Sequence, residues 1–128
     1  MPSIVKIDPR RRVVLSTFYG DVTDEQLMVH RSAIAADRFF DPSFAEIVDF
    51  SGATMPQFSQ PALAKLAKSK SLFDPSVPHV IIAPHDASFT MALGYQQLAK
   101  DSRANLFVVR SLAEAHDLLK QHGYSGEP

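Results

Sequence analysis

One short segment, His79-Val80-Ile81-Ile82-Ala83, constrains the fold more than any other part of the sequence. It is almost entirely apolar, has the length of a β-strand and lies between Pro78 and Pro84. A strand that is apolar on both sides is typical of a parallel sheet, because the crossover helices of such a sheet cover both faces. We therefore expect a strand here that is covered on both faces, in a sheet with helices above and below it.

Further strand signals precede and follow this segment. Residues 4–7 and 13–19 are separated by the turn-forming group Asp8-Pro9-Arg10, and together they predict a β-hairpin. Residues 45–50 and 106–109 are dominated by apolar and β-branched side chains, which predicts one more strand at each place. The chain thus contains five predicted strands.

The first helix is predicted to run from about Asp24 to Ala36. Thr23 and Gln26 have the spacing of a capping box, in which a hydroxyl and an amide side chain satisfy free N–H groups at a helix start. Seven-residue spacing within the helix predicts one buried stripe, formed by Leu27, Met28, Ile34 and Ala35.

Three more helices follow the later strands. The second is expected to begin near Ser59. The last is expected to begin after Ser111 and run through about Lys120, with Gly123 as the residue that ends it. The third is expected to be capped by Asp86 or Ser88 and to carry on one side Met91, Gly94, Tyr95 and Leu98. The resulting order, ββαβαβαβα, predicts one α/β domain over residues 1–128, with a mainly parallel sheet and an antiparallel N-terminal edge strand.

Composition argues against several classes of function. Thirteen Lys and Arg against fourteen Asp and Glu give a net charge of −1, which supplies no field to attract nucleic acid. The absence of cysteine excludes disulfides, thiolate nucleophiles and cysteine zinc sites, and it fits a reducing compartment. No stretch approaches the roughly 18 apolar residues of a membrane span. We therefore expect a cytoplasmic protein with neither a nucleic-acid partner nor a membrane span.

Three motifs carry a resemblance to a known family. They are Gly20-Asp21-Val22-Thr23 before the first helix, Val48-Asp49-Phe50-Ser51-Gly52 at a strand end, and Ser111-Leu112-Ala113-Glu114-Ala115 at the last helix. In these motifs and in the order of its elements, the chain resembles the SpoIIAA-like family and the STAS domain of anti-sigma-factor antagonists. The resemblance implies a STAS-like fold and a non-catalytic regulatory or protein-interaction role, with a protein partner or with a second copy of the chain as a homodimer.

The resemblance also implies a candidate phosphorylation site. In the antagonists, a serine at the start of the helix after the Asp-Leu-Ser-Gly strand is phosphorylated by a partner kinase, and this serine corresponds to Ser59. Here the preceding aspartate is replaced by Gln57 and the following glycine by Gln60, with Pro61 next. We therefore expect an interaction module without an intact phosphoswitch, and Ser59 has a helix N-cap as its alternative role.

The carboxyl ends of the predicted strands are the expected place for a ligand or partner, because parallel α/β sheets bind ligands there. The polar residues expected at this edge are Asp49, Ser51, Thr54, His85, Asp86, Ser88, Arg110 and Ser111. Apolar residues also fall in or near its loops and helix starts, namely Phe50, Met55, Phe58, Phe73, Phe89, Met91 and Tyr95. If some of these line a cleft between the second and third helices, an apolar small molecule or a partner's helix is the expected occupant.

Catalysis and metal binding have less support. Ser51, His85 and Asp86 supply the groups of a hydrolase triad, but there is no Gly-x-Ser-x-Gly turn, and adjacent His and Asp seldom orient one another. His79 and His85 bracket one strand and should lie roughly 20 Å apart, too far to share a metal ion. We expect no catalytic residue, metal or cofactor. A carrier or sensor of an apolar molecule is the alternative function, and a hydrolase is a weaker one.

Overall fold

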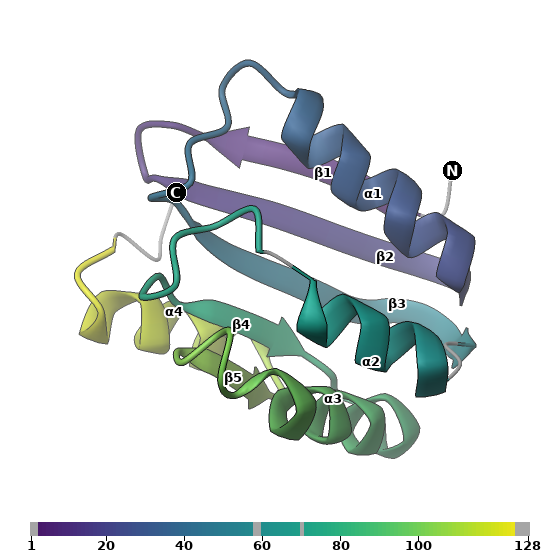
Figure 1. Cartoon of the computed structure of the whole chain (residues 1–128). Coiled ribbons are helices and arrows are strands. Elements are labelled where there is room, and N and C mark those ends of the chain that lie inside the picture. Colours follow the sequence, from purple (N-terminus) through teal and green to yellow (C-terminus); the bar gives the residue numbers. More distant parts are fainter. Residues whose placement is uncertain (1–2, 58–59, 70, 125–128) are drawn as a thin grey trace.

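The computed structural model describes residues 3–57, 60–69 and 71–124. Within these residues a five-stranded sheet has the order β1-β2-β3-β4-β5 (Figure 1). The strands are β1 (Ser3–Asp8), β2 (Val13–Thr23), β3 (Ala45–Gln57), β4 (His79–Ile82) and β5 (Leu106–Val109). β1 is antiparallel to β2 and all other pairs are parallel, which confirms the predicted α/β class and the antiparallel edge strand.

Four helices complete the described part of the chain and confirm the predicted order. They are α1 (Asp24–Ala36), α2 (Gln60–Lys68), α3 (Asp86–Ala99) and α4 (Leu112–Gln121). Each parallel strand lies beside the strand before it, so right-handed crossovers place α1, α2 and α3 on one face of the sheet. Figure 1 shows these three helices in front of the sheet and α4 behind it. None of the described helices has the length and apolar character needed to cross a membrane.

Strand β4, which lies between β3 and the edge strand β5, is buried on both faces, as its apolar sequence predicts. Its residues alternate between two cores: Ile81 belongs to the core beneath α1 to α3, and Val80 and Ile82 pack with Ala115 and Leu119 of α4. All four residues of β4 are buried. The sheet is therefore covered on both sides along this strand, with α4 alone on the second face.

The N-terminus of α1 has the predicted capping box. The Gln26 N–H donates to Thr23 Oγ1 at 3.4 Å, and the Thr23 N–H donates to Gln26 Oε1 at 2.9 Å. The predicted buried stripe is only half right, because Met28 is 48% exposed and Ala35 is exposed. Positions 28 and 35 are turned about 100° from 27 and 34 around the helix. The buried side is instead formed by Leu27, His30 and Ile34, and it includes a histidine.

The starts of α3 and α4 differ in their caps. The N-cap of α3 is His85, which makes no side-chain capping bond. The prediction that Asp86 or Ser88 caps this helix is therefore wrong. Ser88 is buried in the first turn and donates to the His85 carbonyl at 3.0 Å. Ser111 is the predicted N-cap of α4, and its Oγ accepts from the Glu114 N–H at 3.2 Å.

Candidate functional site

The predicted residues at the carboxyl edge form local contacts. Arg110 follows β5 and donates from Nη1 to Asp86 Oδ1 at 2.8 Å, while its guanidinium lies over the Phe89 ring at 4.0 Å from the centroid. This ion pair joins the end of β5 to the start of α3, and both side chains are exposed. Asp86, one member of the triad considered from sequence, is thus paired with Arg110.

The other predicted edge residues are also placed by the backbone around them. Ser51 is exposed, and its N–H donates to Asp49 Oδ1 at 2.8 Å, which is a local turn bond. His85 is exposed at the α3 start. Phe58, Ser59 and the side chain of Thr54 lie outside the described residues. The structure therefore gives these residues local bonds and does not bring them to one cavity among the described residues.

A cleft of about 140 Å³ opens on the sheet face that α1, α2 and α3 cover. Phe18 of β2 and Phe50 of β3 form its floor, and their rings stack with centroids 5.2 Å apart. Its apolar walls come from all three helices, namely Leu27 and Ile34 of α1, Leu63 and Leu66 of α2, and Met91 and Ala92 of α3. The cleft lies where α1 rests on β1 and β2 while α2 packs against α3. Figure 1 shows the two helix groups apart over the sheet.

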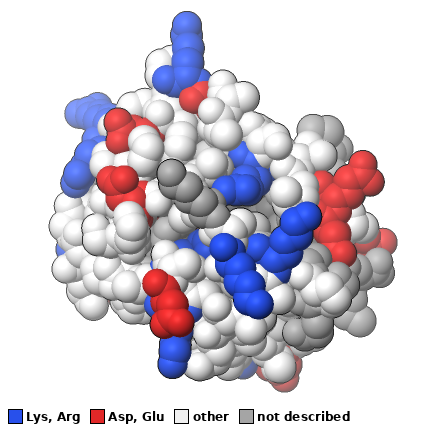
Figure 2. Space-filling model, viewed as in Figure 1, with Lys and Arg blue, Asp and Glu red and all other residues white. Residues whose placement is uncertain are grey.

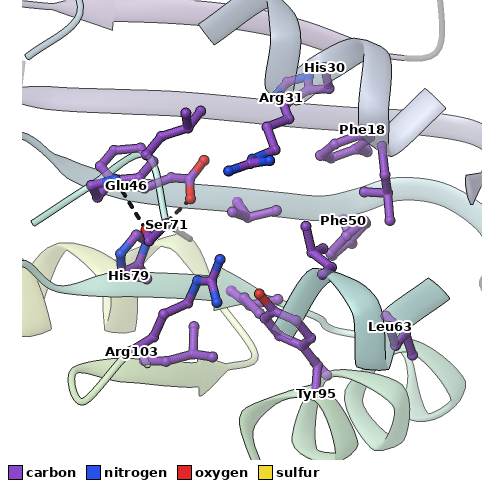
Figure 3. A pocket seen from close by; sticks show the side chains of 18 of the residues that line it. Phe18, His30, Arg31, Glu46, Phe50, Leu63, Ser71, His79, Tyr95 and Arg103 are labelled. Atoms are coloured by element: carbon purple, nitrogen blue, oxygen red, sulfur yellow. Dashed lines mark hydrogen bonds and ion pairs between the residues drawn. The ribbon is translucent and has the colours of Figure 1, made fainter. Parts of the chain in front are cut away.

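One end of this cleft is polar. Glu46 and His79 are paired neighbours at the starts of β3 and β4, so their side chains lie side by side on the cleft face. His79 Nδ1 is 3.3 Å from Glu46 Oε1, and the Ser16 hydroxyl donates to Glu46 Oε2 at 3.1 Å. Figure 3 shows the Glu46 carboxylate between Arg31 on one side and His79 on the other. Both carboxylate oxygens therefore have partners inside the protein.

Two arginines point into the same end of the cleft (Figure 3). Arg103 is only 8% exposed, and its Nη1 donates to the Ala67 carbonyl and to Ser102 Oγ, both at 3.2 Å. Arg31 reaches in from α1 and lies near the Glu46 carboxylate. Burial raises the pKa of Tyr95, while the charges of Arg103 and Arg31 oppose that rise. Both guanidinium groups are thus close enough to act on one phenol in the cleft.

His30 is a buried polar residue in the cleft wall. It is 5% exposed, its ring lies 4.5 Å from the Phe18 ring between centroids, and neither ring nitrogen has a hydrogen-bond partner among the described residues. Burial lowers its pKa, and the nearby charge of Glu46 partly offsets this effect. The imidazole is therefore neutral near pH 7, with one unpartnered donor and one unpartnered acceptor. Such groups are rare in protein interiors and are costly unless a bound group satisfies them.

Comparison with known proteins adds no assignment. The chain shows no significant match to a protein-family model, a curated protein or a solved structure. The chemistry of the cleft is therefore the basis for any function. Among the described residues, no group of three or more His, Asp or Glu side chains is placed to hold a metal ion.

The polar end of the cleft was not predicted from the sequence, whereas part of its apolar lining was. Phe50, Phe73, Met91 and Tyr95 belong to the apolar group that we expected near a cleft, and all four line this one. The missed signal was Glu46, a charged residue in the otherwise apolar strand Ala45-Glu46-Ile47-Val48. Alternation along a strand places residue 46 on the same face as Val48 and Phe50, beneath the helices.

Proposed function

We propose that this chain is a non-catalytic binding protein for a small amphipathic molecule, which occupies the cleft beside α1 and α2. The observation that carries the proposal is a cleft with apolar walls and a few polar groups gathered at one end, because ligand sites commonly have this composition. A volume of about 140 Å³ is close to that of cavities that bind benzene. The apolar part of the ligand is therefore one ring or a short branched chain.

The arrangement at the polar end supports binding and not nucleophilic catalysis. In a nucleophilic triad the imidazole lies between the hydroxyl and the carboxylate, and so can remove the hydroxyl proton. Here the carboxylate of Glu46 lies between the Ser16 hydroxyl and His79. Ser16 is fully buried and is not among the residues that line the cleft, so its hydroxyl holds the Glu46 carboxylate and does not face a ligand.

We further propose that the chain is a STAS-like, SpoIIAA-like regulatory module and that ligand binding regulates its contact with a partner. The order of the elements supports this assignment, as does the strand end at residues 48–52. The second helix is the face at which we expect a protein partner or a second copy, and Leu63 and Leu66 of α2 line the cleft. A ligand in the cleft thus contacts the helix that a partner would meet. Size-exclusion chromatography with light scattering, with and without ligand, measures whether assembly depends on occupancy.

A cleft-filling variant tests the binding function. Ligand-observed NMR with phenylacetamide, a neutral single-ring probe, should show binding to the wild-type protein. Leu66→Trp places an indole in the cleft and should weaken this binding by about tenfold or more, since little space for a ring is left.

The matched control is Leu93→Trp, because Leu93 is on α3 but is 40% exposed. It should leave the affinity unchanged, and circular dichroism checks that both variants fold. Equal affinity of Leu66→Trp and the wild-type protein, or no binding to the wild-type protein, would refute the proposal.

A further inference from the structure

We infer that the ligand of this cleft is a small monocarboxylic acid, whose carboxylate lies between Arg31 and Arg103 and whose apolar body rests on Phe18 and Phe50. This inference rests on the proposed function and adds the chemical class of the ligand. Four features of the cleft support it: the balance of charge, the geometry of Arg103, the unpartnered His30, and the charge around the mouth.

Among the described residues, positive charge exceeds negative charge at the polar end. Arg31 and Arg103 supply two permanent cations, and Glu46 supplies one anion among the described lining residues. The Glu46 oxygens already face Ser16 and His79, at 3.1 and 3.3 Å. An additional anion is therefore attracted here, and the attraction is stronger than in water because the walls are apolar.

Arg103 is held in a position suited to a carboxylate. Its two hydrogen bonds, to Ala67 and Ser102, both use Nη1 and fix the guanidinium at the end of α2. The N–H groups of Nη2 and Nε find no acceptor among the described residues, and Figure 3 shows the guanidinium pointing into the cleft. A planar guanidinium with two free parallel donors matches the two oxygens of a carboxylate.

His30 gives an independent indication that the cleft takes a ligand with a polar group. It lies on α1 beside Arg31, and its buried ring nitrogens have no partner in the part of the chain that the structure describes. The charge of Glu46 acts on this imidazole, which places His30 within electrostatic reach of the polar end. A neutral imidazole donates one hydrogen bond, and a carboxylate oxygen is an acceptor that would satisfy it.

The surface around the cleft carries the charge that an anion needs on approach. Figure 2 shows Lys and Arg side chains gathered in the middle of this face, while Asp and Glu lie towards its periphery. Lys65 and Lys68 are exposed residues of α2, a helix that lies on this face. A local positive field around a cleft raises the concentration of anions there, although the net charge of the chain is −1.

The test compares three ligands of nearly equal shape and different charge. NMR titration of the full chain with phenylacetate, phenylacetamide and 2-phenylethylamine should give the lowest Kd for phenylacetate, by about tenfold over the amide, and the highest for the amine. Raising the salt concentration should weaken phenylacetate binding and leave phenylacetamide binding nearly unchanged.

Variants locate the charge responsible. Arg31→Gln should remove most of the preference for phenylacetate and keep the affinity for phenylacetamide. The control is Arg38→Gln, because Arg38 is an exposed loop residue whose guanidinium lies over Phe39. This control should change neither the preference nor the affinity. If Arg31→Gln does not fold, the three-ligand series and its salt dependence in the wild-type protein still decide. Equal Kd for acid and amide, or tightest binding of the amine, overturns the carboxylic acid while the binding function stands. Failure of all three ligands to bind overturns both.

Discussion

Glu46 shows how one residue in a strand defines the polar end of the cleft. Parallel pairing of β3 and β4 places Glu46 directly beside His79, and pairing of β2 and β3 places it next to the strand that carries Ser16. The carboxylate therefore receives its two partners from both neighbouring strands. This arrangement keeps a charged group on the buried face of the sheet without leaving its oxygens unpaired.

His30 makes stability depend on pH. Because burial lowers its pKa below the ordinary value of about 6.5, the unfolded chain binds a proton at a higher pH than the folded chain does. The free energy of unfolding should thus fall as pH drops below about 6.5, with a contribution from this residue of at most about 1.4 kcal/mol per pH unit. His30→Leu should flatten the profile in this range, measured by urea denaturation at several pH values.

His85→Gln is the matched control for this experiment. His85 is exposed and its side chain makes no capping bond, so this variant replaces a histidine that lies outside the buried cleft wall. Parallel pH profiles of the wild-type protein and His30→Leu would show that burial of this imidazole has no such effect.

At the scale of elements, α1 carries the polar residues that distinguish this cleft from an ordinary apolar core. Its buried side brings in Leu27, His30 and Ile34, and Arg31 extends from the neighbouring position. The helix starts at the Thr23 capping box, directly after β2. The orientation of this wall therefore depends on how firmly the first turn is held.

Loss of the capping box should destabilise α1. Thr23→Ala removes the acceptor of the Gln26 N–H and should lower the free energy of unfolding by about 1 kcal/mol. Ser32→Ala, at an exposed position within the same helix, is the control and should change stability little. Urea denaturation of the two variants and the wild-type protein measures both effects. If the two variants lose equal stability, the cap is not the cause.

The order of the elements was predictable because it depends on local patterns. The capping box at Thr23, the apolar segment before Pro84 and the turn at residues 8–10 each act over a few residues. Some boundaries of the elements were not predictable. For example, β3 continues to Gln57 because it pairs with the extended end of β2. That extension depends on a partner strand more than 30 residues away, and a single segment carries no signal for it.

The cleft was less predictable, because long-range pairing assembles it. Glu46 meets His79 through the register of β3 and β4. Arg103, which follows α3, donates to the carbonyl of Ala67 in α2. The rule that parallel sheets bind ligands at their carboxyl ends directed attention to residues such as Asp49, His85 and Arg110, which do not line this cleft. In sequence, His30 was an isolated histidine, and only the fold shows that it is buried beside Phe18.

At the scale of the whole molecule, the two faces of the sheet differ. α4 closes one face over Val80 and Ile82, whereas the three helices on the other face leave the cleft between them. The face with the cleft also carries the central group of Lys and Arg side chains (Figure 2). The fold thus uses one face for a closed core and the other, we propose, for a ligand.

The most direct test of this proposal is NMR chemical-shift mapping of phenylacetate on the wild-type protein, with backbone amides assigned. We predict saturable shifts centred on Arg31, Glu46, Tyr95 and Arg103, with intermolecular NOEs from the phenyl ring to Leu27 and Met91. Asp86 and Arg110 at the carboxyl edge should show no comparable shift. Shifts centred on that edge, or no saturable shift at millimolar ligand, would contradict a binding site in the cleft.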